Sequence, residues 1–210
     1  MCIRDRLWGQ NKEGDWQILD DNSATDADLW LAYTLLEAGR LWQVERYSAL
    51  GELIASRILS EVMTDLPGLG PVLLPAPVGF ADEPGQWRLN PSYTPPQVLL
   101  RLSSLFPNSP WPQLERTNWV FLEQAALDGY PPDWVLFSAD TQMQRDLATG
   151  GIGSYDAIRV FLWLGMLGSH HEHRDGLSKQ FGRMLDFVEA NSFPPEIMKP
   201  DGDEGVGPPG

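Results

Sequence analysis

The sequence has 210 residues, of which 42% are hydrophobic, and this composition suits one globular domain with a sizeable core. Its 29 acidic residues outnumber 15 Lys and Arg, and the formal net charge of -14 argues against nucleic acid and against an anionic membrane surface as partners. The single cysteine, Cys2, excludes an internal disulfide, and residues 160–167, the longest apolar stretch, are far shorter than the ~20 residues of a membrane-spanning helix.

Helical spacing first appears at residues 26–38, where apolar side chains recur at intervals of three and four. Thr25 is a suitable N-cap for this helix, and Gly39 predicts its end. A second apolar stripe predicts a helix over residues 44–63. Because the connection is short, we expect an antiparallel helix pair.

The middle of the chain changes character. Residues 66–96 are rich in Gly and Pro, which predicts an ordered loop with room for one short β-hairpin. Helical spacing then returns in four segments, at residues 96–106, 111–126, 152–167 and 176–190. Helix pairs joined by long loops are therefore the predicted architecture.

Two acidic residues lie in the first turn of the first predicted helix. Asp28, three residues after Thr25, fits a capping box. Asp26 is two residues from Asp28, and this spacing turns its side chain by about 200° around the helix. Both carboxylates cannot serve the same cap, so Asp26 is free to face a cleft.

Several motifs, spread in order along the chain, are similar to glycoside hydrolase family 8. They include residues 24–32 and the runs Trp8-Gly9, Asn90-Pro91-Ser92-Tyr93, Pro132-Asp133-Trp134 and Ser154-Tyr155-Asp156-Ala157-Ile158-Arg159. The resemblance covers residues 7–199 closely and is strongest to endo-1,4-β-glucanases (cellulases) of bacterial cellulose synthesis. Residues 1–6 match nothing in the family and form an unmatched leader, and residues 200–210 are a Gly- and Pro-rich end without core-forming side chains.

The resemblance implies an all-α fold, an incomplete (α/α)6 barrel with about six of the twelve helices and with long loops. It also implies inverting hydrolysis of β-1,4-glucan in an acidic and aromatic cleft, without a metal ion or other cofactor. Inversion uses two carboxyl groups about 6.5–9.5 Å apart, one as the acid for the leaving oxygen and one as the base for water.

The same resemblance assigns roles to individual residues. Asp156 matches the general base, and Asp26 matches the carboxylate that holds the distorted sugar at the cleavage point. We expect both to line one cleft, with Arg159 one helical turn from Asp156. The residues expected to bind substrate are Tyr93, Tyr155, Arg159, Trp8, Asn90 and Trp134.

Each aromatic assignment has a structural alternative. Without the resemblance, Tyr93 would be interpreted as a turn-packing residue after Pro91. The sequence has nine Trp residues, and a glucan cleft would use some of them for stacking on sugar rings. Four of them lie within helical stripes and are interpreted as core residues: Trp30, Trp42, Trp119 and Trp163.

The His-rich segment 169–175 has the composition of a metal cluster but lies in a predicted interhelical loop. No distant ligand has a recognisable zinc-site spacing, so we interpret this segment as a solvated loop.

The general acid of the family is a glutamate in a Ser-Glu-Gly motif ahead of the Trp-Gly pair, and this sequence contains no such motif. We therefore expect a central piece of a hydrolase, without the acid-bearing segment and the closing helices, that is inactive alone. The alternative is a non-catalytic glucan-binding fragment. A periplasmic location and proximity to the cellulose synthase complex follow from the resemblance alone.

Overall fold

The computed structural model describes residues 7–81, 83–202 and 205, with the backbone alone for residues 7 and 8. The predicted leader at residues 1–6 and most of the predicted frayed end lie outside this part of the chain. The elements in chain order are β1(Leu7–Gln10), β2(Trp16–Asp20), α1(Thr25–Trp42), α2(Glu45–Val62), β3(Met63–Leu66), β4(Gly70–Leu73), β5(Gln86–Leu89), the 3-10 helix η1(Pro91–Tyr93), α3(Pro96–Leu105), α4(Trp111–Ala125), β6(Val135–Ser138), β7(Gln142–Arg145), α5(Ala157–Gly165), α6(Arg174–Gln180) and α7(Gly182–Asn191).

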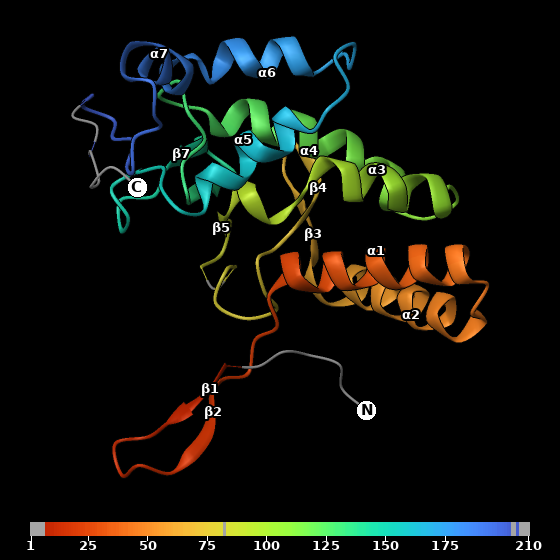
Figure 1. Ribbon diagram of the computed structural model, residues 1–210. Coiled ribbons are helices and arrows are strands. Elements are labelled where there is room, and N and C mark those ends of the chain that lie inside the picture. Colours follow the sequence, from red (N-terminus) through yellow and green to blue (C-terminus); the bar gives the residue numbers. More distant parts are fainter. Residues whose placement is uncertain (1–6, 82, 203–204, 206–210) are drawn as a thin grey trace.

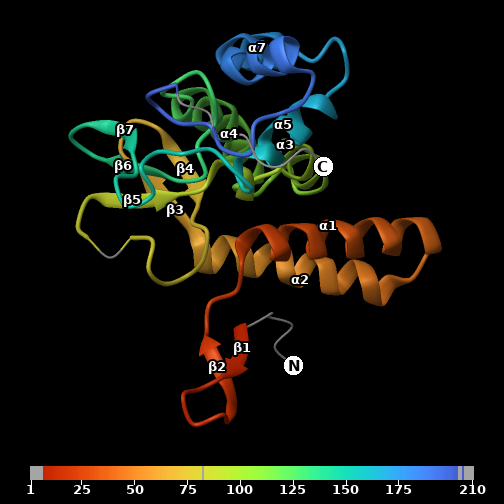
Figure 2. The same cartoon turned by 60° about the vertical axis from the view of Figure 1, so that its left-hand side comes forward.

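The first two helices form the predicted antiparallel pair (Figures 1 and 2). They approach closely at Gly39, where an added Cβ would lie 2.7 Å from the backbone nitrogen of Ser48. The prediction that Gly39 ends the first helix was therefore wrong, because this glycine lies inside α1 as a contact point. The helix ends three residues later, and Gln43 takes the left-handed conformation with a φ of 56°.

The start of α1 also differs from the prediction. Ala24 is the N-cap residue and Thr25 is the first helical residue, and no side chain makes a cap hydrogen bond there. The Thr25 hydroxyl instead donates to the carbonyl of Leu74 at 2.6 Å. The predicted Thr25 cap is replaced by a buried bond that ties the beginning of α1 to the chain after β4.

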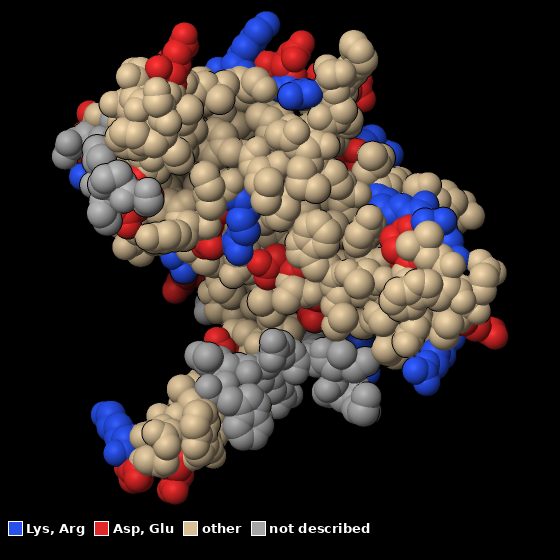
Figure 3. Space-filling view, viewed as in Figure 1, with Lys and Arg blue, Asp and Glu red and all other residues tan. Residues whose placement is uncertain are grey.

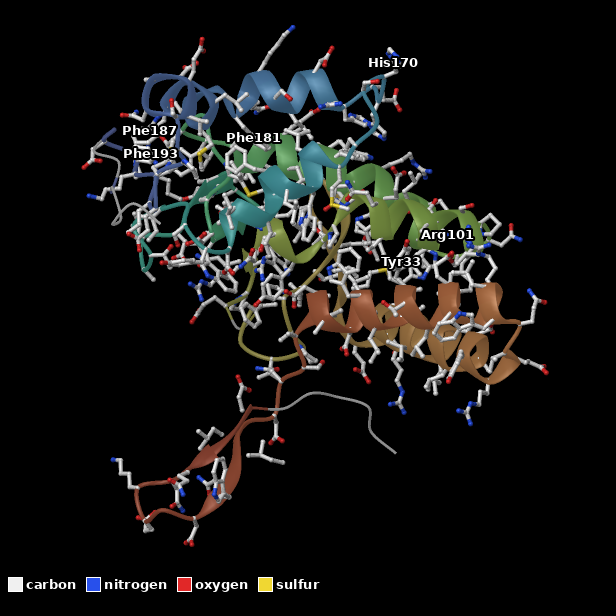
Figure 4. All side chains as sticks on the ribbon, in the orientation of Figure 1. Tyr33, Arg101, His170, Phe181, Phe187 and Phe193 are labelled. Atoms are coloured by element: carbon white, nitrogen blue, oxygen red, sulfur yellow. The ribbon has the colours of Figure 1, made fainter. Side chains whose placement is uncertain are left out.

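Helices α3 and α4 occupy the predicted segments to within one residue. The segment predicted as a helix from residue 152 is helical only from Ala157. The last predicted helix is divided into α6 and α7 at Phe181, which is fully buried against the neighbouring helices (Figure 4). Gly182 follows it directly, and glycine is a poor helix former.

Besides the helices, the described chain has three small antiparallel sheets. The β3–β4 hairpin is the one expected in the Gly- and Pro-rich region, whereas the β1–β2 hairpin, which stands away from the body in Figures 1 and 2, and the sheet β5–β6–β7 had no counterpart in the sequence analysis. In the three-stranded sheet, Leu89 pairs with Val135. This register places Asn90 and Trp134 at the same end of the sheet, although they are far apart in sequence.

The main core lies among α1 to α4 and the sheets next to them, and a smaller cluster joins α4 to α5 and α6. The core interpretation is confirmed for Trp119 and Trp163, which are 4% and 8% exposed. It is wrong for Trp42, which is 68% exposed at the end of α1. Trp30 is half-buried and packs against Trp163 with ring centroids 5.6 Å apart.

Polar contacts also connect the helices. Glu37 on α1 accepts a hydrogen bond from Arg101 on α3 at 2.6 Å, and Figure 4 shows Arg101 and Tyr33 at this helix interface. Arg40 bonds to the same carboxylate, and these cations hold the pKa of Glu37 below its usual value. Among the residues in the described ranges, no helix is long and apolar enough to cross a membrane.

Residues 169–173 of the His-rich segment form a loop, as predicted, whereas Arg174 and Asp175 already belong to α6. His170 extends from the body in Figure 4. The other histidines of the segment are less solvated than expected. His173 stacks on Trp119 at 4.5 Å between ring centroids, and His171 lies 5.0 Å from the same ring. Within the part of the chain that the structure covers, no group of three or more His, Cys, Asp or Glu is arranged to hold a metal ion.

Candidate active site

Three segments converge on one face of the helical body: the first turn of α1, the loop and 3-10 helix that follow β5, and the first turn of α5. They bring together Asp26, Asn90, Ser92, Asp156 and Arg159. Figure 3 shows basic and acidic side chains next to one another near the middle of one face of the molecule.

The Asp156 carboxylate is held at both oxygens. Oδ1 accepts a hydrogen bond from Nη2 of Arg159 at 2.6 Å, and Oδ2 accepts one from Nδ2 of Asn90 at 2.8 Å. The side chain of Asp156 keeps 31% of its surface exposed. The carboxylate is therefore fixed in orientation and still reachable from solvent.

Arg159 connects the two acidic residues that the sequence analysis singled out. Its Nη1 lies 3.5 Å from Oδ2 of Asp26, and its Nη2 bonds to Asp156. Its guanidinium carbon also lies 5.5 Å from the centre of the Tyr93 ring. Asp26 and Asp156, which are 130 positions apart in sequence, thus contact a single guanidinium.

Burial is the main influence on Asp26 and raises the pKa of its carboxyl above the usual value. The backbone N–H of Ala27 and the charge of Arg159 oppose this shift, and the nearby Asp156 adds to it. Burial, Asp26 and Asp156 likewise raise the pKa of Tyr93. Tyr93 therefore keeps its hydroxyl proton and can donate a hydrogen bond to a ligand.

The first turn of α5 is capped from a distant segment. Asp156 occupies the N-cap position with a φ of -78° and makes no cap hydrogen bond. The buried Asp133 takes this role, because its Oδ1 accepts from the backbone N–H groups of Ala157 and Ser154, both at 2.8 Å. Its Oδ2 accepts from the Ser154 hydroxyl. The Asp156 carboxylate is therefore available to the site.

Trp134 lies beside Tyr93, with ring centroids 6.0 Å apart. The Arg88 guanidinium carbon is 4.2 Å from the Trp134 ring centre, and Phe80 stacks nearly parallel to it at 5.6 Å. Asp146 holds Arg88 through a 2.8 Å ion pair. The Trp134 ring is thus firmly placed next to the site, with part of its surface occupied by the chain's own side chains.

One predicted substrate-binding residue, Tyr155, lies outside this cluster. Tyr155 is 75% exposed, and its hydroxyl donates to Glu196 at 2.8 Å, away from the cluster around Arg159. The side chain of Trp8 lies outside the described part, so its stacking role stays a prediction. Ser92 and Asp133 were not predicted as site residues, although both lie within the motifs that resemble the family. Their buried polar contacts between segments become visible only in the folded chain.

Comparison with known proteins places these features in a family. The model of "Glycosyl hydrolases family 8" matches residues 4–200. An endoglucanase of Escherichia coli (strain K12) is 43% identical over 190 residues, which are 90% of this chain and 51% of that protein. An endoglucanase of Xanthomonas axonopodis pv. citri is 42% identical over 201 residues, with 96% and 51% covered. The chain thus spans about half the length of the curated relatives it matches.

Solved structures give a consistent picture. The crystal structure of an endo-1,4-D-glucanase from Vibrio fischeri ES114 superposes with a TM-score of 0.88 at 42% identity, over 97% of this chain and 59% of that one. A cold-adapted family 8 xylanase shares the fold with a TM-score of 0.68 at 17% identity, over 97% and 54%.

Proposed function

The chain belongs to glycoside hydrolase family 8 and has part of the (α/α)6 barrel of that family, and we propose that the protein hydrolyses β-1,4-glucan as an endoglucanase with inversion at the anomeric carbon. The observation that carries this proposal is the Asp156 carboxylate, held at one oxygen by Asn90 and at the other by Arg159, beside Asp26. The endoglucanase names of the relatives support glucan as the substrate class.

In this proposal Asp156 is the general base. It accepts a proton from a water molecule as the water oxygen bonds to the anomeric carbon and the glycosidic bond breaks. Asn90 and Arg159 hold the carboxylate with its lone pairs directed at the water. Asp26 binds hydroxyl groups of the sugar at the cleavage point, and Tyr93 donates a hydrogen bond from its protonated hydroxyl.

The leaving oxygen also needs a proton. The family resemblance assigns this step to a glutamate in a Ser-Glu-Gly motif, which the 210 residues do not contain. General acid catalysis typically contributes about 10²- to 10⁴-fold to the rate. The activity is therefore proposed for a protein that includes such a glutamate, and the 210-residue chain by itself would cleave glucan at least about 100-fold more slowly.

The test is hydrolysis of cellohexaose by the product of the full-length gene, followed by NMR. We expect the α-anomer to appear first, and Asp156→Asn to abolish hydrolysis while cellohexaose affinity stays within about two-fold. The substitution keeps the shape of the side chain and removes its ability to accept the proton. A β-anomer as the first product, or wild-type hydrolysis by Asp156→Asn, would contradict the proposal.

A non-catalytic glucan-binding role is the second candidate, and the missing Ser-Glu-Gly motif favours it for the 210 residues taken alone. Tryptophan fluorescence with cellohexaose measures binding, and reducing-end assays on the same sample measure cleavage. Saturable binding without cleavage, both in this chain and in the full-length gene product, would support the binding role against the enzyme.

We further propose a periplasmic location and a role in cellulose synthesis, for which the support is the sequence resemblance. Cell fractionation of the source organism and measurement of cellulose output after gene deletion test both points. Recovery of the protein only in the cytoplasm, or unchanged cellulose after deletion, would contradict them.

A further inference from the structure

We propose that Ser92 is the positioning residue of this site, whose single hydroxyl sets the orientation of both groups that hold Asp156. The inference rests on the proposed role of Asp156 as the base. Ser92 lies in η1, is 1% exposed, and belongs to neither acidic residue's own helix. It acts through Asn90 and Arg159 rather than by touching substrate.

The direction of each hydrogen bond follows from the chemistry of the partners. Arg159 has donors only, and its Nη2 and Nε lie 2.7 and 3.2 Å from the Ser92 hydroxyl oxygen. The hydroxyl must therefore accept from Arg159 and give its one proton elsewhere. Its remaining partner is Oδ1 of Asn90, at 2.7 Å.

This donation and the backbone N–H of Ser92 together determine which way the Asn90 amide faces. Oδ1 of Asn90 accepts both the hydroxyl proton and the backbone N–H of Ser92, the latter at 3.0 Å. A flipped amide would place its NH₂ group against these two donors and its oxygen against the Asp156 carboxylate. Ser92 thus keeps Nδ2 of Asn90 directed at Asp156, where it donates at 2.8 Å.

The same hydroxyl fixes the guanidinium. Arg159 lies between the carboxylates of Asp156 at 2.6 Å and Asp26 at 3.5 Å, and two negative partners alone would let it move between them. The bond to Ser92 ties it to η1, whose backbone carbonyl at Ser92 accepts from Nε1 of Trp163 at 3.4 Å. Both groups that hold the Asp156 carboxylate are therefore bonded to one buried hydroxyl.

The experiment compares Ser92→Ala with Thr94→Val in the product of the full-length gene. Thr94 is the matched control, because it is also buried and its hydroxyl also bonds to an amide oxygen, that of Asn118 at 2.6 Å. Neither Thr94 nor Asn118 contacts Asp156 among the hydrogen bonds found in the described residues. Each substitution removes one buried hydroxyl, so their effects on thermal stability should be similar.

We expect Ser92→Ala to lower kcat for cello-oligosaccharides by about 10- to 100-fold with KM within about two-fold, because small misplacement of a reacting group has effects of this size. Thr94→Val should keep the wild-type kcat. Ser92→Thr, which retains the hydroxyl, should recover most of the lost kcat.

Equal kcat for folded Ser92→Ala and wild type would overturn the inference, as would equal kcat losses in Ser92→Ala and Thr94→Val. If Ser92→Ala does not fold, Ser92→Cys takes its place, because a thiol is close in shape and a weak donor and acceptor. If the wild type hydrolyses glucan, Asp156→Asn does not, and substitutions at Ser92 have no effect, then this inference alone is refuted. A wild-type protein that cleaves no glucan would refute the proposed function and this inference with it.

Discussion

Asp26 shows how a side chain of the candidate site can lower the stability of the fold. Its side chain is 20% exposed. Burial disfavours the charged carboxylate more than the Ala27 N–H and Arg159 favour it, so the pKa of Asp26 is raised. A buried charge is tolerated here because the proposed role needs a carboxylate in the cleft. Sites of this kind commonly exchange stability for activity.

Asp26→Asn should therefore change how stability depends on pH. In the folded state the Asp26 carboxyl stays protonated above its ordinary pKa of 3.8. The wild type therefore loses stability relative to Asp26→Asn as the pH rises from 3.8 through the raised pKa. Below this window the two proteins should be equally stable, and at neutral pH the variant should be the more stable one. Urea unfolding between about pH 3 and pH 7 measures the difference.

A stability difference that is constant with pH would contradict the burial argument. A difference that grows in favour of the wild type as pH rises would show that the attraction of Arg159 dominates. Hydrolysis serves as the functional control, since Asp26→Asn should lower kcat at every pH if the carboxylate binds the sugar.

Helix α5 shows how an element can begin with a functional residue. Its N-cap position is occupied by Asp156, whose side chain faces the site, and the cap bonds come from Asp133. We expect Asp133→Ala to lower the free energy of unfolding by about 1–3 kcal/mol, because three donors lose their acceptor, among them the buried N–H of Ala157. Denaturant unfolding at neutral pH measures this loss.

Asp133→Asn is the matched variant, because its one oxygen can still accept from the N–H groups of Ser154 and Ala157. It should lose less than half as much stability as Asp133→Ala. Equal losses in the two variants would mean that the charge of Asp133 matters more than the cap bonds. A loss below about 0.5 kcal/mol in Asp133→Ala would contradict the capping role.

Elements with local signals were predictable from the sequence. The stripes of α1 to α4 have helical periodicity over ten or more residues, and their predicted bounds were close except at the end of α1, which extends beyond Gly39 to Trp42. The start of α5 was placed too early because its cap comes from Asp133, which lies in another segment. The strands of the sheet β5–β6–β7 have four residues each, and β5 pairs with β6 across a long sequence separation.

The contacts of the candidate site can likewise be separated into local ones, which the sequence predicts, and non-local ones, which it does not. Asp156 and Arg159 are three residues apart, so their ion pair follows from one helical turn. The contacts of Ser92 with Arg159 and of Asp133 with Ser154 and Ala157 join segments that are far apart in sequence, and neither type of residue has a periodic signal. The family resemblance brought Asp26 and Asp156 into one cleft in the sequence analysis, and the contact of both with Arg159 is the geometry that agrees with it.

At the scale of the whole molecule, the net charge of -14 sets how polymers approach. Neutral glucans feel no long-range force from this charge, whereas carboxymethylcellulose is itself a polyanion and is repelled. Screening shortens the reach of this repulsion from about 30 Å at 0.01 M salt to about 8 Å at 0.15 M. A charge effect should therefore appear in the salt dependence of binding.

We expect the Kd for carboxymethylcellulose to fall several-fold as salt rises from about 0.01 to about 0.15 M, because repulsion between the two polyanions is screened. The Kd for neutral hydroxyethylcellulose should change by less than about two-fold, since stacking on aromatic rings and hydrogen bonds to hydroxyl groups carry no net charge. Tryptophan fluorescence titrations with both polymers, at equal chain length and in the same buffers, measure the two trends.

Equal salt dependence for the two polymers would show that the charges lie too far from the site to affect binding. Weaker carboxymethylcellulose binding at high salt would mean that the cationic groups at the site, Arg88 and Arg159, outweigh the charge of the whole molecule.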